Sequence, residues 1–381
     1  MAMDFPSSPT ERQVFNAAPG VSYEYFSGVW RPAPMKTALP KNYVVNPSMQ
    51  ISQEIGDTII SPGAGVAGSC YPADQWVLYH AAIPGASIAT LGQSIHVNNI
   101  NRWVQFYTNN GPLTVNAGDY AQCRQYIEGQ RCADFKWGTA DAVDLVLRFD
   151  FLGVSGQVYH VGVYTPDFYY LQKFSGVGYQ TASFAIPGCT TGTFNTGAST
   201  YGVFINFNCL AGTTYQDSQF NLGKWRAWPP KYGSTVSTSF IQGTASSFQF
   251  SNVGLYLDPF KTGVAPPYEH PDIFEELRRC QRYYAKLYGM RGWMLASNQV
   301  IRPSQQLPAP MRIAPALSMA GAPQWYDGTA SALASATVAF NGSNEFVAEL
   351  NGTAAAGLTG NRPAVQFWNS DANYWAANAR M

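Results

Sequence analysis

The chain has 381 residues with 23 basic and 23 acidic side chains, so its formal charge is zero. Only 12% of the residues are charged, whereas 46% are hydrophobic and 14% are aromatic. A neutral chain lacks the positive field that binds phosphate backbones, which argues against a basic nucleic-acid binder. The hydrophobic content excludes wholesale disorder, and the missing Ala/Glu/Lys/Leu-rich periodicity excludes coiled coils. The composition favours a mainly β protein with two or three domains.

Residues 1–40 are predicted to form an N-terminal attachment module around a β-hairpin. Residues 21–25 alternate apolar and polar side chains, Ser27-Gly28 form a turn, and residues 29–30 begin the return strand. A lone hairpin is marginal in water, so we expect this one to pack on a partner subunit or another protein. No basic stretch followed by an apolar run opens the chain, so we expect no signal peptide and no membrane insertion.

Residues 41–268 are predicted to form one jelly-roll β-sandwich. Roughly eight segments rich in β-branched and aromatic residues are separated by Gly, Pro, Asn and Ser turns, which is typical of sandwiches and jelly rolls. The alternation is clearest in residues 144–151, where Leu145, Leu147, Phe149 and Phe151 share one face. We expect that face to be buried. The opposite face, with Asp144, Val146, Arg148 and Asp150, should be mostly exposed to water.

Residues 269–289 are predicted to form a connector helix. Asp272 is expected to cap its first turn, with Glu275 three residues later as in a capping box, and Gly289 is expected to end it. One stripe of a surface helix must be buried. We expect this stripe to pack against the jelly roll or a symmetry mate through Leu277, Cys280, Tyr283 and Tyr284.

Residues 290–381 return to β character and are predicted to form a small C-terminal β domain. Aromatic residues there lie among small polar ones, and sugar sites combine Trp and Tyr platforms with Asn, Asp and Gln. Packing in the core or at a subunit interface explains the same pattern. The glycan-binding candidates are Trp325, Tyr326, Asp327, Trp368, Asn369, Tyr374 and Trp375. Trp103, Phe106 and Tyr107 in the jelly roll have the same character.

No motif for catalysis, metal binding or a cofactor stands out. None of the four histidines has a paired metal spacing, and no nucleophile elbow or phosphate loop occurs. Asp144 and Asp150, the most regular carboxylate pair, lie roughly 20 Å apart along an extended strand, too far for a glycosidase pair. We therefore expect no enzyme, no cofactor and no metal. The six cysteines are expected as buried thiols, with a Cys123–Cys132 or Cys189–Cys209 bridge as the alternative in an oxidising setting.

Five segments resemble the tail-fibre-like structural proteins of tailed bacteriophages, which carry a carbohydrate-binding-module-like jelly roll. The most specific is the helix with Cys-Gln-Arg-Tyr-Tyr at residues 280–284, and together the segments span residues 1–318. They are DFPSSPT with a hairpin ending at Gly28–Trp30, NYVVNPSMQISQEIG with YPADQW, QYIEGQRCADFKWGTADA, PPYEHPDIFEELRRCQRYY and LPAPMRIAPALS. Residues 319–381 match nothing in that family, whose C-terminal part is usually variable and faces the host.

The resemblance implies a virion protein made in the host cytoplasm: a tail-fibre or receptor-binding subunit that attaches to the host surface by non-covalent glycan recognition. It also implies a homotrimer and contact with other virion proteins, for which the attachment candidates are Phe5, Pro6, Tyr23, Tyr25 and Trp30. Two alternatives remain open. One is a purely structural collar, baseplate or capsid-decoration component, and the other is a polysaccharide depolymerase.

Overall fold

The computed structural model forms two compact units, residues 1–41 and residues 42–381. It describes residues 5–11, 13–18, 21–32, 40–56, 68–80, 102–107, 115–218, 221–234, 247–288, 291–296, 299–320, 324–326, 331–332, 335–340, 344–354, 362–367 and 374–381. Antiparallel sheets dominate, so the mainly β prediction is confirmed.

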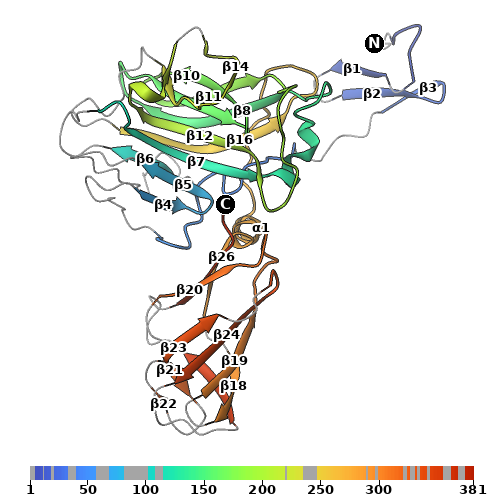
Figure 1. Cartoon of the computed structure of the whole chain (residues 1–381). Helices are drawn as coiled ribbons and strands as arrows, with labels where there is room; N and C mark the ends of the chain where they lie inside the picture. Colours follow the sequence, from blue (N-terminus) through green and yellow to red (C-terminus); the bar gives the residue numbers. More distant parts are fainter. Residues whose placement is uncertain are drawn as a thin grey trace. The chain divides into compact units, whose positions relative to one another are not determined.

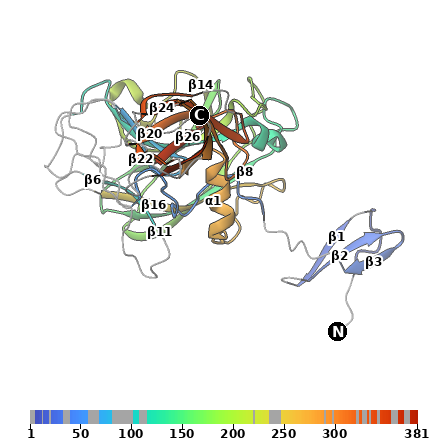
Figure 2. The same ribbon diagram turned by 90° about the horizontal axis from the view of Figure 1, so that it is seen from below.

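The first unit is a three-stranded sheet of β1 (Val14–Ala18), β2 (Val21–Phe26) and β3 (Val29–Pro32) (Figure 2). The predicted hairpin is present as β2 and β3, and β1 adds a third strand that the sequence did not indicate. The ring of Phe5 stacks on Trp30 at 5.1 Å between centroids and contacts Phe15 and Tyr23 at 5.2 and 5.1 Å. These rings stay half-buried, so the unit has an aromatic cluster without a closed core.

Two antiparallel sheets packed face to face form the sandwich (Figure 1). The larger has the order β14-β10-β9-β12-β7-β5-β4 and the smaller β11-β8-β16-β6. Their strands are β4 (Gly68–Ala73), β5 (Trp76–His80), β6 (Val104–Tyr107), β7 (Tyr120–Glu128), β8 (Leu145–Gly153), β9 (Tyr159–Tyr164), β10 (Phe168–Phe174), β11 (Gly178–Ile186), β12 (Tyr201–Ala211), β14 (Trp225–Ala227) and β16 (Ser247–Leu257). Two short 3-10 helices, η1 (Gly129–Phe135) and η2 (Thr213–Tyr215), lie in the connections.

Aromatic rings fill the space between the two sheets. Phe207 of β12 stacks on Phe250 of β16 at 3.9 Å and meets Phe149 of β8 edge-on at 4.9 Å. The four residues predicted for the inner face of β8 are all buried in this core, which confirms the prediction of that face. Cys123 and Cys189 are buried thiols, so neither of the two bridges considered from the sequence forms.

The outer face of β8 is not wet, contrary to expectation. Asp150 is only 3% exposed because its carboxylate accepts hydrogen bonds from four side chains. The donors are Arg148, Tyr179, Thr181 and Asn252, at 2.8, 2.9, 2.6 and 2.7 Å. Donors from β8 itself and from its two neighbours, β11 and β16, thus satisfy this buried charge.

The connector helix α1 (Ile273–Gln281) is shorter than predicted. Asp272 caps it as expected, since its Oδ1 accepts the N–H groups of Phe274 and Glu275 at 2.9 and 3.0 Å. The helix ends eight residues before Gly289, so the assignment of Gly289 as the C-terminal cap is wrong. Instead, residues 284–287 form β17, which pairs with β26, nearly a hundred residues further along the chain.

The C-terminal strands form two sheets (Figure 1). The first, β17-β26-β20, comprises β17 (Tyr284–Leu287), β26 (Tyr374–Asn378) and β20 (Ala316–Ala320). The second has the order β22-β21-β25-β18-β19-β24-β23. Its strands are β18 (Arg291–Ala296), β19 (Gln299–Gln306), β21 (Gln324–Tyr326), β22 (Ser331–Ala332), β23 (Ser335–Phe340), β24 (Val347–Ala354) and β25 (Arg362–Phe367).

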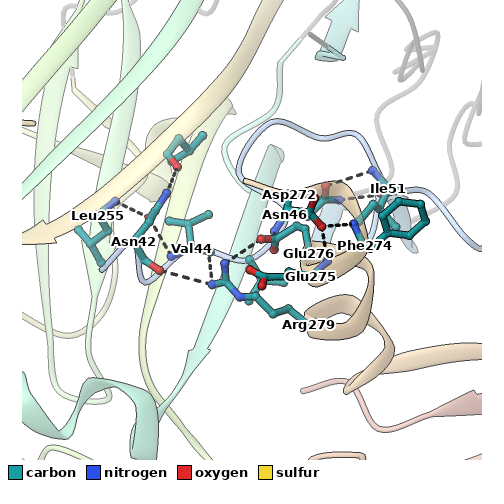
Figure 3. A network of polar contacts seen from close by, with 12 residues as sticks. Asn42, Val44, Asn46, Ile51, Leu255, Asp272, Phe274, Glu275, Glu276 and Arg279 are labelled. Carbon is teal, nitrogen blue, oxygen red and sulfur yellow. Dashed lines mark hydrogen bonds and ion pairs between the residues drawn. The ribbon is translucent and has the colours of Figure 1, made fainter. Parts of the chain in front are cut away.

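A buried polar joint ties the segment before β4 to α1 (Figure 3). Asn46 has a left-handed backbone with φ +51°, and its N–H donates to Glu276 Oε1 at 2.6 Å. Glu276 is 2% exposed and pairs with Arg279 at 2.7 Å, while Arg279 also donates to the carbonyl of Val44 at 2.9 Å. The residues of two motifs that carry the phage resemblance therefore meet in one structural joint.

Candidate ligand-binding face

Alternation along β7 places polar and aromatic side chains on the outer face of the larger sheet. Ala121, Cys123 and Ile127 enter the core between the sheets, so Gln122, Arg124 and Tyr126 project from the opposite side. The neighbouring strands extend this face. Tyr79 of β5 lies opposite Gln122, and Phe204, Asn206 and Asn208 of β12 lie opposite Tyr126, Arg124 and Gln122.

Arg124 is held between aromatic rings at the centre of this face. Its guanidinium carbon lies 4.5 Å from the ring centroid of Tyr79, 4.9 Å from Phe204 and 5.8 Å from Tyr126. Its terminal nitrogens donate to the Tyr126 hydroxyl at 3.0 Å and to Gln122 Oε1 at 2.5 Å. Cation–π contacts of this kind stabilise a cation and fix the plane of the guanidinium. Arg124, Tyr79 and Tyr126 are half-buried, so each side chain keeps part of its surface exposed to solvent.

Arg124 has no ion-pair partner among the described carboxylates, because none of them lies within 4.0 Å of its guanidinium. Burial lowers the pKa of Arg124, but the phenols of Tyr126, Tyr232 and Tyr79 outweigh this effect, so the pKa is raised. Burial raises the pKa of Tyr79 and of Tyr232, so both phenols are neutral at pH 7. Arg124 therefore contributes a positive charge that no described carboxylate within 4.0 Å compensates.

Buried amides surround this arginine. Asn206 Nδ2 donates to Gln122 Oε1 and, at 2.8 Å, to Asn208 Oδ1. Gln122 and Asn206 are fully buried, yet Gln122 Nε2, Asn206 Oδ1 and Arg124 Nε have no hydrogen-bond partner. Unpaired polar atoms are rare in protein interiors, and these three can take part in further hydrogen bonds.

A segment that we call the strap, residues 213–218 and 221–234, covers the far part of the face. Its Tyr232 and Leu222 pack against the outer-face cluster that contains Tyr164 and Phe204. Tyr164 and Phe204 stack at 4.7 Å with an interplanar angle of 3°. Tyr164 lies over Gly162, where a Cβ atom would come within 2.5 Å of its ring. The strap also reaches the part around Arg124, because the phenol of Tyr232 interacts with the side chains of Arg124 and Gln122.

The C-terminal end of the strap contacts His160 of β9. Ser234 N–H donates to Nε2 of His160 at 3.2 Å, so this nitrogen is an acceptor and carries no proton. The Ser234 hydroxyl lies 3.1 Å from the same nitrogen. Burial, and secondly Lys173, lower the pKa of His160 to about 4, so the imidazole is neutral at pH 7.

The glycan-binding candidates from the sequence do not come together as one described site. Trp375 is fully buried in the core of the C-terminal strands, so its indole has no face open to a sugar. Tyr374 is half-buried, with the Lys286 ammonium 4.1 Å from its ring centroid. Trp325 and Tyr326 lie on β21, and Asp327, Trp368 and Asn369 lie outside the described residues.

The other predicted residues have clear positions. Phe5, Tyr23, Tyr25 and Trp30 belong to the aromatic cluster of the first unit, with Pro6 next to Phe5. The helix residues pack inside the chain: Cys280 and Tyr283 join Val45 and Ile51 in a small core with Leu277 against it, and Tyr284 is buried in β17.

The outer-face residues Tyr79, Arg124 and Tyr126 were not singled out from the sequence. A signal existed, because residues 122–126 and 204–208 each alternate polar or aromatic residues with core residues. Neither strand alone showed that Arg124 would lie between rings from two neighbouring strands. In the described ranges, no three metal-binding side chains gather, and no helix has the length and apolarity to cross a membrane.

No protein-family profile matches the chain, and no curated protein matches its sequence. Distant structural similarity is found to a phage tailspike domain and to carbohydrate-binding modules. The enzymatically active domain of tailspike protein 4 of bacteriophage CBA120 is 14% identical over 57% of this chain, with a TM-score of 0.27, and this chain spans 21% of that domain.

Two carbohydrate-binding modules align over nearly their whole length. A CBM4 module is 14% identical over 55% of this chain and 99% of its own, with a TM-score of 0.28. TmCBM61, solved in complex with β-1,4-galactotriose, is 8% identical over 57% of this chain and 99% of its own, with a TM-score of 0.27. At these TM-scores the similarity assigns neither a family nor a function.

Proposed function

We propose that the chain is a receptor-binding-type subunit of a tailed-phage virion that attaches to a glycan on the host surface without cleaving it. The observation that carries this proposal is the cluster on the outer face in which Tyr79, Arg124 and Tyr126 lie half-buried on two paired strands. Aromatic faces bind the apolar C–H faces of sugars, and guanidinium and phenol groups bind their hydroxyls. The phage assignment rests on the resemblance of residues 1–318 alone.

A binding role suits the chemistry of this face better than catalysis. A glycosidase needs two carboxyl groups across the scissile bond. The side chains around Arg124 on β5, β7 and β12 are Tyr, Phe, Asn and Gln, which can hold a sugar but cannot protonate a leaving group, and the carboxylate of Glu128 at the end of β7 is buried in an ion pair with Arg282. In a homotrimer, weak sites of this kind would act together through their effective concentration.

The direct test is binding of the full chain to host cells and to purified surface polysaccharide. Tyr79→Ala removes one ring of the face, and we expect affinity to fall roughly tenfold from the loss of about 1.5 kcal/mol of ring contact. Phe260→Ala is a matched control, because Phe260 is 82% exposed and lies away from this sheet. Its affinity should equal that of the wild type.

Two results would overturn the proposal. Absence of binding to any host cell or polysaccharide would favour the purely structural collar, baseplate or capsid-decoration role. Release of oligosaccharide from a host polysaccharide would favour the depolymerase. Circular dichroism of each variant establishes that a lost signal reflects the face and not the fold.

A further inference from the structure

The charge of the outer face narrows the class of ligand. A guanidinium removed from water is costly unless an anion compensates it, and buried arginines in proteins are normally paired. Arg148, Arg279 and Arg282 each contact a buried carboxylate at 2.7 to 3.0 Å, whereas the buried Arg312 donates to three backbone carbonyls. Arg124 differs from both, because its hydrogen-bond acceptors are a phenol and a side-chain amide.

The geometry of Arg124 leaves it ready to bind an oxyanion. A guanidinium has five N–H donors in one plane, and the hydrogen bonds to Tyr126 and Gln122 use two of them. Tyr79 and Phe204 lie within 5 Å of the guanidinium carbon and hold its plane, and the donors left over are the buried Nε–H and one N–H on each terminal nitrogen. A planar donor edge of this kind binds a carboxylate or phosphate with two parallel hydrogen bonds.

We propose that this face selects anionic glycans, with Arg124 as the residue that binds the carboxylate or phosphate group of an acidic polysaccharide. This inference rests on the proposed function and adds the ligand class to it. Tyr79 and Phe204 hold the guanidinium, and Tyr126 and Gln122 fix its rotation. The neutral sugar units next to the anionic group would lie along the aromatic side chains.

The first experiment needs no variant. The full chain is titrated with a uronic-acid polysaccharide and with the same polymer after its carboxyl groups have been reduced to alcohols. We expect the reduced polymer to bind at least tenfold more weakly, and binding of the acidic polymer to weaken as salt is raised. A phosphodiester-containing polymer is a third ligand, and binding to it instead would identify phosphate as the source of the anion.

The second experiment changes the arginine. Arg124→Gln should abolish the preference for the acidic polymer, and Arg124→Lys should retain part of it because the charge stays while the planar edge is lost. Arg278→Gln is the matched control, because Arg278 is exposed on α1 and its replacement removes the same charge from the chain. Its preference should equal that of the wild type.

The two proposals fail in different ways. Equal affinity of the wild type for the acidic and the reduced polymer would overturn the selection of anions and leave glycan binding intact. Absence of binding to every polymer and to host cells would overturn the proposed function itself. A preference for the acidic polymer that survives in Arg124→Gln would assign the anion site to another residue and overturn the role of Arg124.

Discussion

Arg282 donates two hydrogen bonds to the carboxylate of Glu128, from Nε to Oε1 at 3.0 Å and from Nη2 to Oε2 at 3.1 Å. Glu128 ends β7 and is 1% exposed, while Arg282 follows the last turn of α1. The hydrogen bond raises the pKa of Arg282. One ion pair thus joins the larger sheet of the sandwich to the point where the helix ends and β17 begins.

Replacing one partner of this pair should destabilise the chain. Arg282→Met leaves the buried Glu128 carboxylate without its bidentate partner, so we expect the free energy of unfolding to fall by about 3 kcal/mol. Urea denaturation measures it. The double variant Arg282→Met with Glu128→Gln should recover most of the loss, because no unpaired buried charge remains. Equal losses in the single and double variants would show that the charge pairing is unimportant.

Asn46 should be intolerant of alanine. Its side chain donates to the carbonyls of Ile51 and Asp74 at 2.7 and 3.1 Å and accepts from the N–H of Ile51 at 3.1 Å. Asn46→Ala leaves buried backbone groups unpaired and replaces Asn, which tolerates positive φ comparatively well, with Ala, which does not, so we expect a loss of about 4 kcal/mol. Asn46→Gly removes the same hydrogen bonds but tolerates the backbone, and should lose about 1 kcal/mol less. Equal losses would exclude backbone strain as a contribution.

His160 should make stability fall in acid. Its pKa of about 4 in the folded chain lies below the ordinary unfolded value of about 6.5, so the unfolded state binds the proton first. The contribution is complete above pH 6.5 and is lost as pH falls towards 4, with a slope of up to about 1.4 kcal/mol per pH unit. Unfolding free energies of wild type and His160→Gln between pH 4 and 7 measure the difference. Parallel curves would contradict the prediction.

The same protonation should weaken the contact between the end of the strap and β9. A proton on His160 Nε2 removes the acceptor for the N–H of Ser234, so amide exchange of residues 232–234 should accelerate at pH 4 relative to the intrinsic rate. His160→Gln is the control, because its exchange should lack this pH dependence.

The aromatic cluster of residues 1–41 should unfold independently of the remainder. Trp30→Ala removes the stacking with Phe5 and the contacts with Phe15 and Tyr25. We expect hydrogen exchange in β1 to β3 to rise by about tenfold or more, corresponding to the 0.5–1.5 kcal/mol of one ring pair plus its buried area. Exchange in β7 should stay unchanged, since the two units are compact separately. A rise in both would contradict their independence.

Local patterns were sufficient for features decided by neighbours in sequence. The alternation of Leu145, Leu147 and Phe149 predicted which face of β8 is buried, and the position of Asp272 predicted the helix cap. The end of α1 was mispredicted, because apolar residues at helical spacing continue into a strand that pairs with β26. Non-local pairing overrode the local periodicity there.

The candidate face could not be predicted for the same physical reason. In the sequence Arg124 is an ordinary strand residue, because the rings that contact it, Tyr79 and Phe204, belong to strands about 45 and 80 residues away. Trp375 shows the converse, since its aromatic and polar neighbours in sequence suggested a sugar platform while the strand pairing buries its ring.

The joint between Asn46 and Glu276 has a mechanical consequence. These residues are 230 positions apart, and between them lies almost the whole sandwich, while their backbone and side chain are joined by a 2.6 Å hydrogen bond. Tension applied between residues 42 and 282 would run across this joint, because the hydrogen bond is a far shorter path than the chain between Asn46 and Glu276. The strands of the sandwich would then carry little of the load, so its sheets would keep their shape for as long as the joint holds.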